Sequence, residues 1–280
     1  MRKIMMAAVA AVALAAATPA AATVTLSLVD SFSTGEAFGL AYDGSNLWVS
    51  RSNGSFYEVT TSGVVTGNSG QGPFWSALAY NSANNKLAVQ QGSNLVQFDR
   101  PTGSNVDYST LNPTSTTIPN AYGGLIDGLD IEGGTLWWSP DIDLVWNSPV
   151  NGSGDRTLFL GGAGGYSGVE FVDLASHDYV IVVNDALNPR RLCVHETNAV
   201  EVGCTSLPNS RYEDLAFDGR YLYAADYFGN RIDKIDLLVD GGSIFDPSTG
   251  GVPEPSSWAL MILGFGGVGS LLRRRRVAFA

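Results

Sequence analysis

One short pattern recurs five times along the chain and limits the fold more than any other feature. Each copy has a small residue, a short apolar run, a turn and a second apolar run. The copies are FGLAYDGSNLWVS (38–50), SALAYNSANNKLAV (76–89), DGLDIEGGTLWWS (127–139), SGVEFVDLASHDYVIVV (167–183) and EDLAFDGRYLYAAD (213–226). Successive copies lie 38, 51, 40 and 46 residues apart when aligned at Gly39, Ala77, Gly128, Gly168 and Asp214.

A mean step of about 44 residues is typical of the four-stranded blades of a β-propeller. The turns agree, because Asp43-Gly44 and Asp218-Gly219 are hairpin dipeptides in which glycine accepts a positive φ. Further strands follow the paired runs as SFYEVTT, NLVQFDR, RLCVHE and NRIDKID, and fourth strands as TLFLGG and AVEVGC. No long amphipathic helix is visible. We therefore predict an all-β propeller of five four-stranded blades, with six blades as the alternative.

The fifth unit has no visible fourth strand after Asp236, whereas residues 24 to 33 form an unassigned β-rich run before the first unit. We expect this run to supply the outer strand of the last blade, because closing the ring removes an exposed sheet edge. The predicted propeller domain is then 23–239. Residues 111–124 are expected to be a loop insertion, and the Pro- and Gly-rich segment 240–251 a flexible linker.

The last unit, DLAFDGRYLYAADYFGNRIDKID, resembles an NHL-type propeller repeat in its Asp-Gly turn, its Tyr-Ala-Ala-Asp strand end and the sequence Asn-Arg-Ile at 230–232. The other units diverge from that pattern. The resemblance therefore implies the architecture and carries no activity with it.

The N-terminus has the three parts of a secretory signal peptide. Arg2 and Lys3 are a basic start, an alanine-rich apolar run extends over 4–17, and Ala20 to Ala22 offer a small-residue cleavage site. The alternative is a short N-terminal core helix. We expect residues 1–22 to be a signal peptide, so the body is exported.

The C-terminus, residues 252–280, combines a stiff Pro-Glu-Pro, an oily run and a basic end. Trp258 to Leu272 has 15 residues, four of them glycine. It spans roughly 22 Å as a helix, less than the ~30 Å hydrocarbon core. The basic cluster should stay on the cytoplasmic side. The residues that define the pattern are Pro253, Glu254, Pro255, Trp258, Arg273, Arg274, Arg275 and Arg276.

These elements, in this order, closely resemble the PEP-CTERM sorting signal. The resemblance implies transient insertion of a short transmembrane helix into the inner membrane of a Gram-negative bacterium that makes exopolysaccharide. It further implies processing by exosortase near Pro-Glu-Pro and release to the cell surface or matrix. An ordinary C-terminal membrane anchor is the alternative. The resemblance covers about 25 of 280 residues and leaves the body's function open.

Charge argues against a nucleic-acid partner. The chain has 16 basic and 27 acidic residues, and six of the basic ones are in the two terminal segments. The remaining 10 against 27 give a net charge of −17, which repels phosphate backbones. Such a body suits divalent cations or neutral polymers, although acidity also simply keeps an exported protein soluble.

The two cysteines, Cys193 and Cys204, flank a turn in RLCVHETNAVEVGC. Export places them in an oxidising compartment, and a short hairpin would bring them within reach of each other. We predict a disulfide between them, with two buried thiols as the alternative.

Several acids fall near the starts of the inner strands, where a propeller has its central channel. They are Asp127, Asp130, Glu170, Glu213 and Asp214. Clustered carboxylates repel one another unless a cation joins them, so a Ca²⁺ site is one interpretation and solvated loop acids the other. Propellers of the gluconolactonase type hold a divalent metal with Glu, Asn and Asp. Glu36, Asn184 and Asp185 are at suggestive places here, but the motifs of that family do not match residue by residue.

Nucleophilic catalysis is not indicated. The only histidines, His177 and His195, lack a nucleophile motif nearby, and we predict no catalytic residue. Among the tryptophans, Trp48 and Trp137 occupy equivalent second-strand positions and are expected in the core. Trp75 and Trp146 are the candidates for stacking on a sugar.

Two functions remain. The first is a non-catalytic surface or matrix protein that binds polysaccharide or protein partners and requires no cofactor. The second is a divalent-metal-dependent hydrolase or lactonase that uses the channel acids. Enzymatic activity is left uncertain, with the binder preferred, because a fold alone confers no activity.

Overall fold

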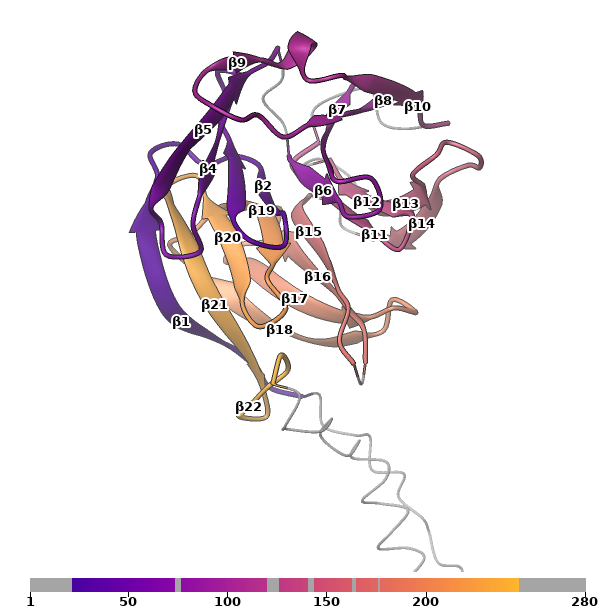
Figure 1. Cartoon of the computed structure of the whole chain (residues 1–280). Coiled ribbons are helices and arrows are strands. Elements are labelled where there is room, and N and C mark those ends of the chain that lie inside the picture. The colour runs from indigo at the N-terminus through magenta and orange to yellow at the C-terminus, as the bar shows by residue number, and fades with distance from the viewer. Residues whose placement is uncertain are drawn as a thin grey trace, which may run out of the picture. The chain divides into compact units, whose positions relative to one another are not determined.

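The computed structural model describes residues 22–73, 77–119, 126–140, 144–162, 165–175 and 177–246, and within them the chain forms five twisted sheets around one axis (Figure 1). Blade 1 contains β2 (Leu40–Tyr42), β3 (Leu47–Ser50), β4 (Ser55–Val59), β5 (Val65–Gln71) and the short β9 (Val106–Asp107). Blade 2 contains β6 (Ala79–Asn81), β7 (Lys86–Gln91), β8 (Asn94–Asp99) and β10 (Thr114–Thr117), with a 3₁₀ turn at Tyr108–Thr110 before β10. Blade 3 contains β11 (Gly128–Glu132), β12 (Thr135–Ser139), β13 (Val145–Pro149) and β14 (Thr157–Leu160).

Blade 4 contains β15 (Tyr166–Val172), β16 (Tyr179–Asn184), β17 (Arg190–Glu196) and β18 (Glu201–Leu207). Blade 5 contains β19 (Tyr212–Phe217), β20 (Leu222–Asp226), β21 (Arg231–Val239), β1 (Val24–Ser33) and the short β22 (Gly242–Ser243). The innermost strands β2, β6, β11, β15 and β19 each contact the next, and β19 contacts β2. The ring is therefore closed, and the predicted all-β propeller of five blades is confirmed.

The N-terminal strand closes the ring. β1 pairs antiparallel with β21 from Val24↔Val239 to Ser33↔Arg231, with one bulge between Leu28 and Asp30. Figure 1 shows β1, in indigo, beside β21, in orange. The outer strand of blade 5 thus comes from the opposite end of the sequence, as predicted for residues 24 to 33.

The described residues form five hydrophobic core clusters, and each lies between two neighbouring blades. Because side chains alternate along a strand, one strand can serve two interfaces. On β12, Trp138 packs toward blade 2 while Trp137 packs toward blade 4. Trp48 is likewise buried between blades 1 and 2, in agreement with the expected core role of Trp48 and Trp137.

Two segments carry more structure than their sequences indicate. Residues 114–117 are β10, the outer strand of blade 2, and Ile118 beside it is buried, so the segment 111–124 is not merely an inserted loop. β22 extends the sheet of blade 5 beyond residue 239, and Phe245 is buried in the blade 4–5 cluster. Both were missed because a polar run such as TSTT shows no apolar alternation, and Gly- and Ser-rich segments look like linkers.

Cys193 in β17 and Cys204 in β18 face each other across the hairpin of blade 4 and are joined by a disulfide. Their Cα atoms are 4.1 Å apart. Among the residues from 22 to 246 that the structure describes, no helix is long and apolar enough to cross a membrane.

Candidate functional site

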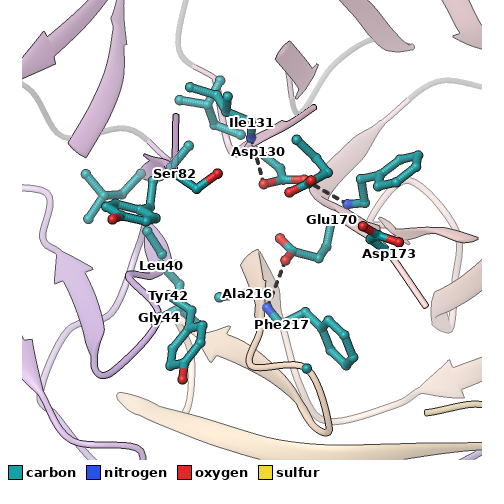
Figure 2. A pocket seen from close by; sticks show the side chains of 18 residues that line it. Leu40, Tyr42, Gly44, Ser82, Asp130, Ile131, Glu170, Asp173, Ala216 and Phe217 are labelled. Atoms are coloured by element: carbon teal, nitrogen blue, oxygen red, sulfur yellow. Dashed lines mark hydrogen bonds between the residues drawn. The ribbon is translucent and has the colours of Figure 1, made fainter. Parts of the chain in front are cut away.

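A cavity of about 260 Å³ opens at one end of the central channel (Figure 2). All five blades contribute to its wall through their innermost strands and the turns that follow them. The lining combines aromatic rings, carboxyl groups and small residues, among them Tyr42, Gly44, Tyr80, Ser82, Asp130, Glu132, Glu170, Phe171, Asp173, Phe217 and Gly219. No lysine or arginine is present among the lining residues that the structure describes.

Asp214, fully buried at the start of β19, holds four blades together. Its Oδ2 accepts hydrogen bonds from the backbone N–H groups of Leu40 and Leu78 at 2.9 and 3.0 Å. Its Oδ1 accepts from Leu129 and Leu215 at 3.3 and 3.1 Å. These donors belong to blades 1, 2, 3 and 5, so one carboxyl group satisfies backbone donors that would otherwise be orphaned in the channel.

Asp130 and Glu170 extend the same kind of link around the ring. Asp130 accepts from its neighbour Ile131 at 2.6 Å and from Phe171 of blade 4 at 2.9 Å. Glu170 of blade 4 accepts from Phe217 of blade 5 at 2.8 Å. In Figure 2 both carboxyl groups point into the cavity. Each inner carboxyl therefore ties its own blade to the next one.

Burial in this acidic environment raises the pKa of all three carboxyl groups. The pKa of Asp130 rises to about 7, because desolvation outweighs the hydrogen bonds that favour its charged form. The pKa of Glu170 rises well above its usual range through burial and through the neighbouring carboxyls of Asp130 and Asp214. Burial also raises the pKa of Asp214, against the opposing effect of its four N–H donors. When Asp130 or Glu170 is protonated, the repulsion between the two carboxyls is relieved and the protonated group can donate a hydrogen bond into the cavity.

The other two predicted metal ligands lie elsewhere. Glu213 forms an ion pair with Arg211, Oε1 to Nε 2.7 Å, at the opposite end of β19 from the cavity. Asp127 precedes β11 at that same end, three residues and roughly 10 Å of strand from Asp130. The five acids named from the sequence are therefore not assembled into one calcium site in the described structure.

Potential metal-ligating side chains of the described residues gather closely at one other place. The one trio of His, Cys, Asp or Glu groups close enough to share an ion is Cys193, Glu201 and Cys204, and the two sulfurs are bonded to each other. Ligation by the channel acids would require their deprotonation and would compete with the blade links. In the described structure Asp130, Glu170 and Asp214 each accept hydrogen bonds from the backbone of a neighbouring blade.

The remaining predicted residues are placed as follows. Trp75 lies outside the described residues. Trp146 is half-buried against Trp138, and the guanidinium of Arg156 lies 3.9 Å from its ring centroid, which covers part of the face that a sugar would need. His195 is buried near Phe159, and burial lowers its pKa to about 4. His177 is an exposed partner of Glu196.

A family model describing the PEP-CTERM protein-sorting motif matches residues 251–276. The chain carries a PEP-CTERM sorting motif. The motif implies processing by exosortase, export and sorting to the cell surface, and it confirms the resemblance seen in the tail. The sorting residues themselves, the apolar run after them and the predicted signal peptide all lie outside the described residues.

Solved structures similar in fold include the glutaminyl cyclase of Myxococcus xanthus, at 13% identity and a TM-score of 0.50, covering 76% of this chain and 97% of that one. The β-propeller domain of Cps50 (Swd1) from Myceliophteria thermophila matches at 13% identity and a TM-score of 0.49, over 75% and 99% of the two chains. The WD40 β-propeller domain of Doa1 matches at 9% and 0.42, over 79% and 72%. No curated protein matches the chain. At these identities the likeness concerns the fold alone.

Sequence reasoning did not assign the blade-linking role of Asp214, although a signal was present. Aligned by repeat, position 214 is aspartate where the other four units have Gly39, Ala77, Gly128 and Gly168. One acidic residue at a position where the other four units have a small residue indicates a side chain that projects toward the neighbouring blades. Its four N–H partners could not be named without the closed ring.

Proposed function

We propose that this PEP-CTERM protein is a non-catalytic component of the cell surface or extracellular matrix, whose propeller binds polysaccharide or protein partners. The observation that carries the proposal is the combination of a sorting motif with a closed ring whose channel acids bind backbone N–H groups. A body built in this way is a rigid scaffold delivered to the outside of the cell. Its loops and blade edges are then the surfaces available to partners.

A groove between blades 1 and 2 adds support for a binding role. It has a volume of about 410 Å³ and a wall rich in amide, hydroxyl and charged groups, namely Glu58, Asn68, Asn84, Asn85, Asp99, Arg100 and Thr102. Groups of this kind form hydrogen bonds with neutral polar ligands. Part of the wall is held in place from within, since Glu58 accepts from Asn68 at 2.8 Å and Asp43 pairs with Arg100.

Sorting can be tested by fractionating cells in which exosortase is inactivated. The protein should move from the surface and medium to the membrane fraction, and Pro253→Ala with Pro255→Ala should have the same effect in cells with active exosortase. An intact chain in the cytosol, with its N-terminal segment uncleaved, would contradict the proposal.

Binding and catalysis can be separated by metal analysis together with a turnover assay. We expect the purified protein to hold no stoichiometric divalent metal and to leave a panel of lactones unchanged. We also expect it to be retained on immobilised polysaccharide or to capture a surface protein. A tightly bound divalent ion whose removal abolishes lactone hydrolysis would instead support the hydrolase.

A further inference from the structure

Phe228 is exposed, whereas every other phenylalanine, tyrosine and tryptophan of the described residues is buried or half-buried. It lies in the turn between β20 and β21 and is 55% exposed. Single exposed apolar side chains are common on protein surfaces, so the setting of the Phe228 ring is what distinguishes it.

Two guanidinium groups and a tyrosine surround the ring. The guanidinium carbons of Arg190 and Arg211 lie over the Phe228 ring, 5.1 and 5.6 Å from its centroid. They are farther from the ring than Arg156 is from Trp146, at 3.9 Å, and they leave Phe228 55% exposed. The ring of Tyr227 lies 6.1 Å away and contacts Phe38 at 5.8 Å. We call Phe228, Tyr227, Arg190 and Arg211 the Phe228 platform.

Buried carboxylates fix the platform from below. Asp185 pairs with Nε of Arg190 at 3.0 Å and with Nε of Arg211 at 2.8 Å. Asp226, which has no exposed surface, accepts from the backbone N–H of Gly229 at 3.1 Å and so fixes the turn that carries the ring. The aromatic face and its flanking N–H donors are therefore preorganised, which lowers the entropy cost of binding.

The platform is separate from the channel cavity. β20 begins beside the Asp218-Gly219 turn, whose glycine lines the cavity, and it ends at Asp226. Phe228 therefore lies at the opposite end of the strand from the cavity. The links made by Asp130, Glu170 and Asp214 can stay intact while the platform is occupied.

We propose that the Phe228 platform binds a neutral polysaccharide by stacking a sugar ring on Phe228. The C–H face of a pyranose is apolar and matches an aromatic face, while its hydroxyl groups can accept from the N–H groups of Arg190 and Arg211. This proposal rests on the proposed binding function and names its site and ligand class.

The size and charge of the platform favour this ligand over others. One aromatic side chain offers ~150–250 Å², whereas a stable protein interface takes ~800 Å² from each partner. One ring is enough for one sugar unit, and a repeating polymer can engage many copies of the protein at once. An acidic polymer is disfavoured, because buried Asp185, Glu213 and Asp226 balance the local arginines and the body is strongly acidic.

Affinity electrophoresis of the full chain through gels containing dextran, glucomannan, xylan or a mixed β-glucan tests the proposal, with polygalacturonate as the acidic comparison. At least one neutral polymer should retard the wild type. Phe228→Ala should weaken that retardation about three- to tenfold, the range expected for loss of one ring contact. Phe228→Tyr should keep it. Leu158→Ala, which truncates an exposed apolar side chain on β14 of blade 3, is the matched control and should also keep it.

The possible failures are distinguishable. Equal retardation of wild type and Phe228→Ala, with unchanged thermal unfolding, overturns the platform and leaves polysaccharide binding in place elsewhere. Retardation by none of the polymers, together with no captured protein, overturns both the platform and the proposed function. Capture of a protein that depends on Phe228, without retardation by a polysaccharide, overturns the sugar assignment.

Discussion

Replacing Asp214 with asparagine removes one acceptor oxygen from the centre of the ring while keeping the shape of the side chain. In the native protein both carboxyl oxygens accept from backbone N–H groups, two donors on each oxygen. The asparagine amide has only one oxygen, and its NH₂ group must face the other two donors. Two buried N–H groups then lose their acceptor, in a channel where Asp214 has no solvent exposure.

The expected loss follows from the cost of unsatisfied donors. Each buried N–H without a partner costs about 1–3 kcal/mol, so Asp214→Asn should lower the free energy of unfolding by about 2–6 kcal/mol. Asp214→Ala leaves all four donors without this acceptor and should cost more, up to about 12 kcal/mol if no water enters. Since a typical domain has only about 5–15 kcal/mol in total, the alanine variant is expected to fold poorly or not at all.

Urea unfolding followed by tryptophan fluorescence measures this loss, because Trp48 and Trp138 are buried between blades and report on their separation. Asp173→Asn is the matched control, since Asp173 is an exposed acid at the rim of the same cavity. The control should stay within about 0.5 kcal/mol of the wild type, as surface substitutions usually do. If Asp214→Asn also stays within that range, the hydrogen bonds of Asp214 contribute nothing measurable to the free energy of unfolding, and the role of Asp214 in linking the blades is refuted.

Three further changes test other parts of the structure. Asp130 has its pKa raised from 3.8 to about 7 in the folded chain, so its contribution to stability is full below pH about 3.8 and is lost as the pH rises through about 7. Asp130→Asn should therefore flatten the fall in unfolding free energy between acidic and neutral pH by up to about 4 kcal/mol, and an unchanged pH profile in urea titrations would rule this out. Cys193→Ser with Cys204→Ser opens a loop with a sequence separation of 11 and should cost about 1–3 kcal/mol in the same assay, with reducing agent affecting only the wild type. Deleting residues 24–33 exposes the edge of β21 and should cause aggregation, whereas a soluble variant with the wild-type melting temperature would contradict closure by β1.

The parts of the fold that follow a local rule were predictable. The hairpins follow from Asp43-Gly44 and Asp218-Gly219, because positive φ at those glycines, 90° and 91°, is what such a turn needs. Closure by 24–33 followed from counting strands, since a sheet edge has to be covered. β10 escaped detection because an outer strand of threonine and serine has little apolar surface to bury and so leaves no periodic signal.

The candidate sites were harder to predict, because they depend on which repeats meet. Asp130 and Glu170 were correctly placed near the channel, yet Asp127 and Glu213 appeared equivalent to them when only the nearness to an inner strand was considered. A shift of three residues along a strand moves a side chain by roughly 10 Å. That distance separates Asp130, which lines the cavity, from Asp127, which lies at the other end of the channel. The sequence did not indicate a site at Phe228, because a single aromatic residue in a turn cannot be told from a core residue until its exposure is known.

By itself the sequence determined the five repeats, the strand that closes them and the sorting motif at the C-terminus, because each depends on spacing or on a contiguous pattern of residue types. Only the tertiary structure decided which backbone N–H groups surround Asp214, which carboxyls share the cavity and which ring faces solvent at Phe228. Those properties arise when segments up to about two hundred residues apart are brought within hydrogen-bond distance, as Thr23 and Asp240 are at a separation of 217. Contacts of that range leave no local trace in the chain, because they form only when the ring closes.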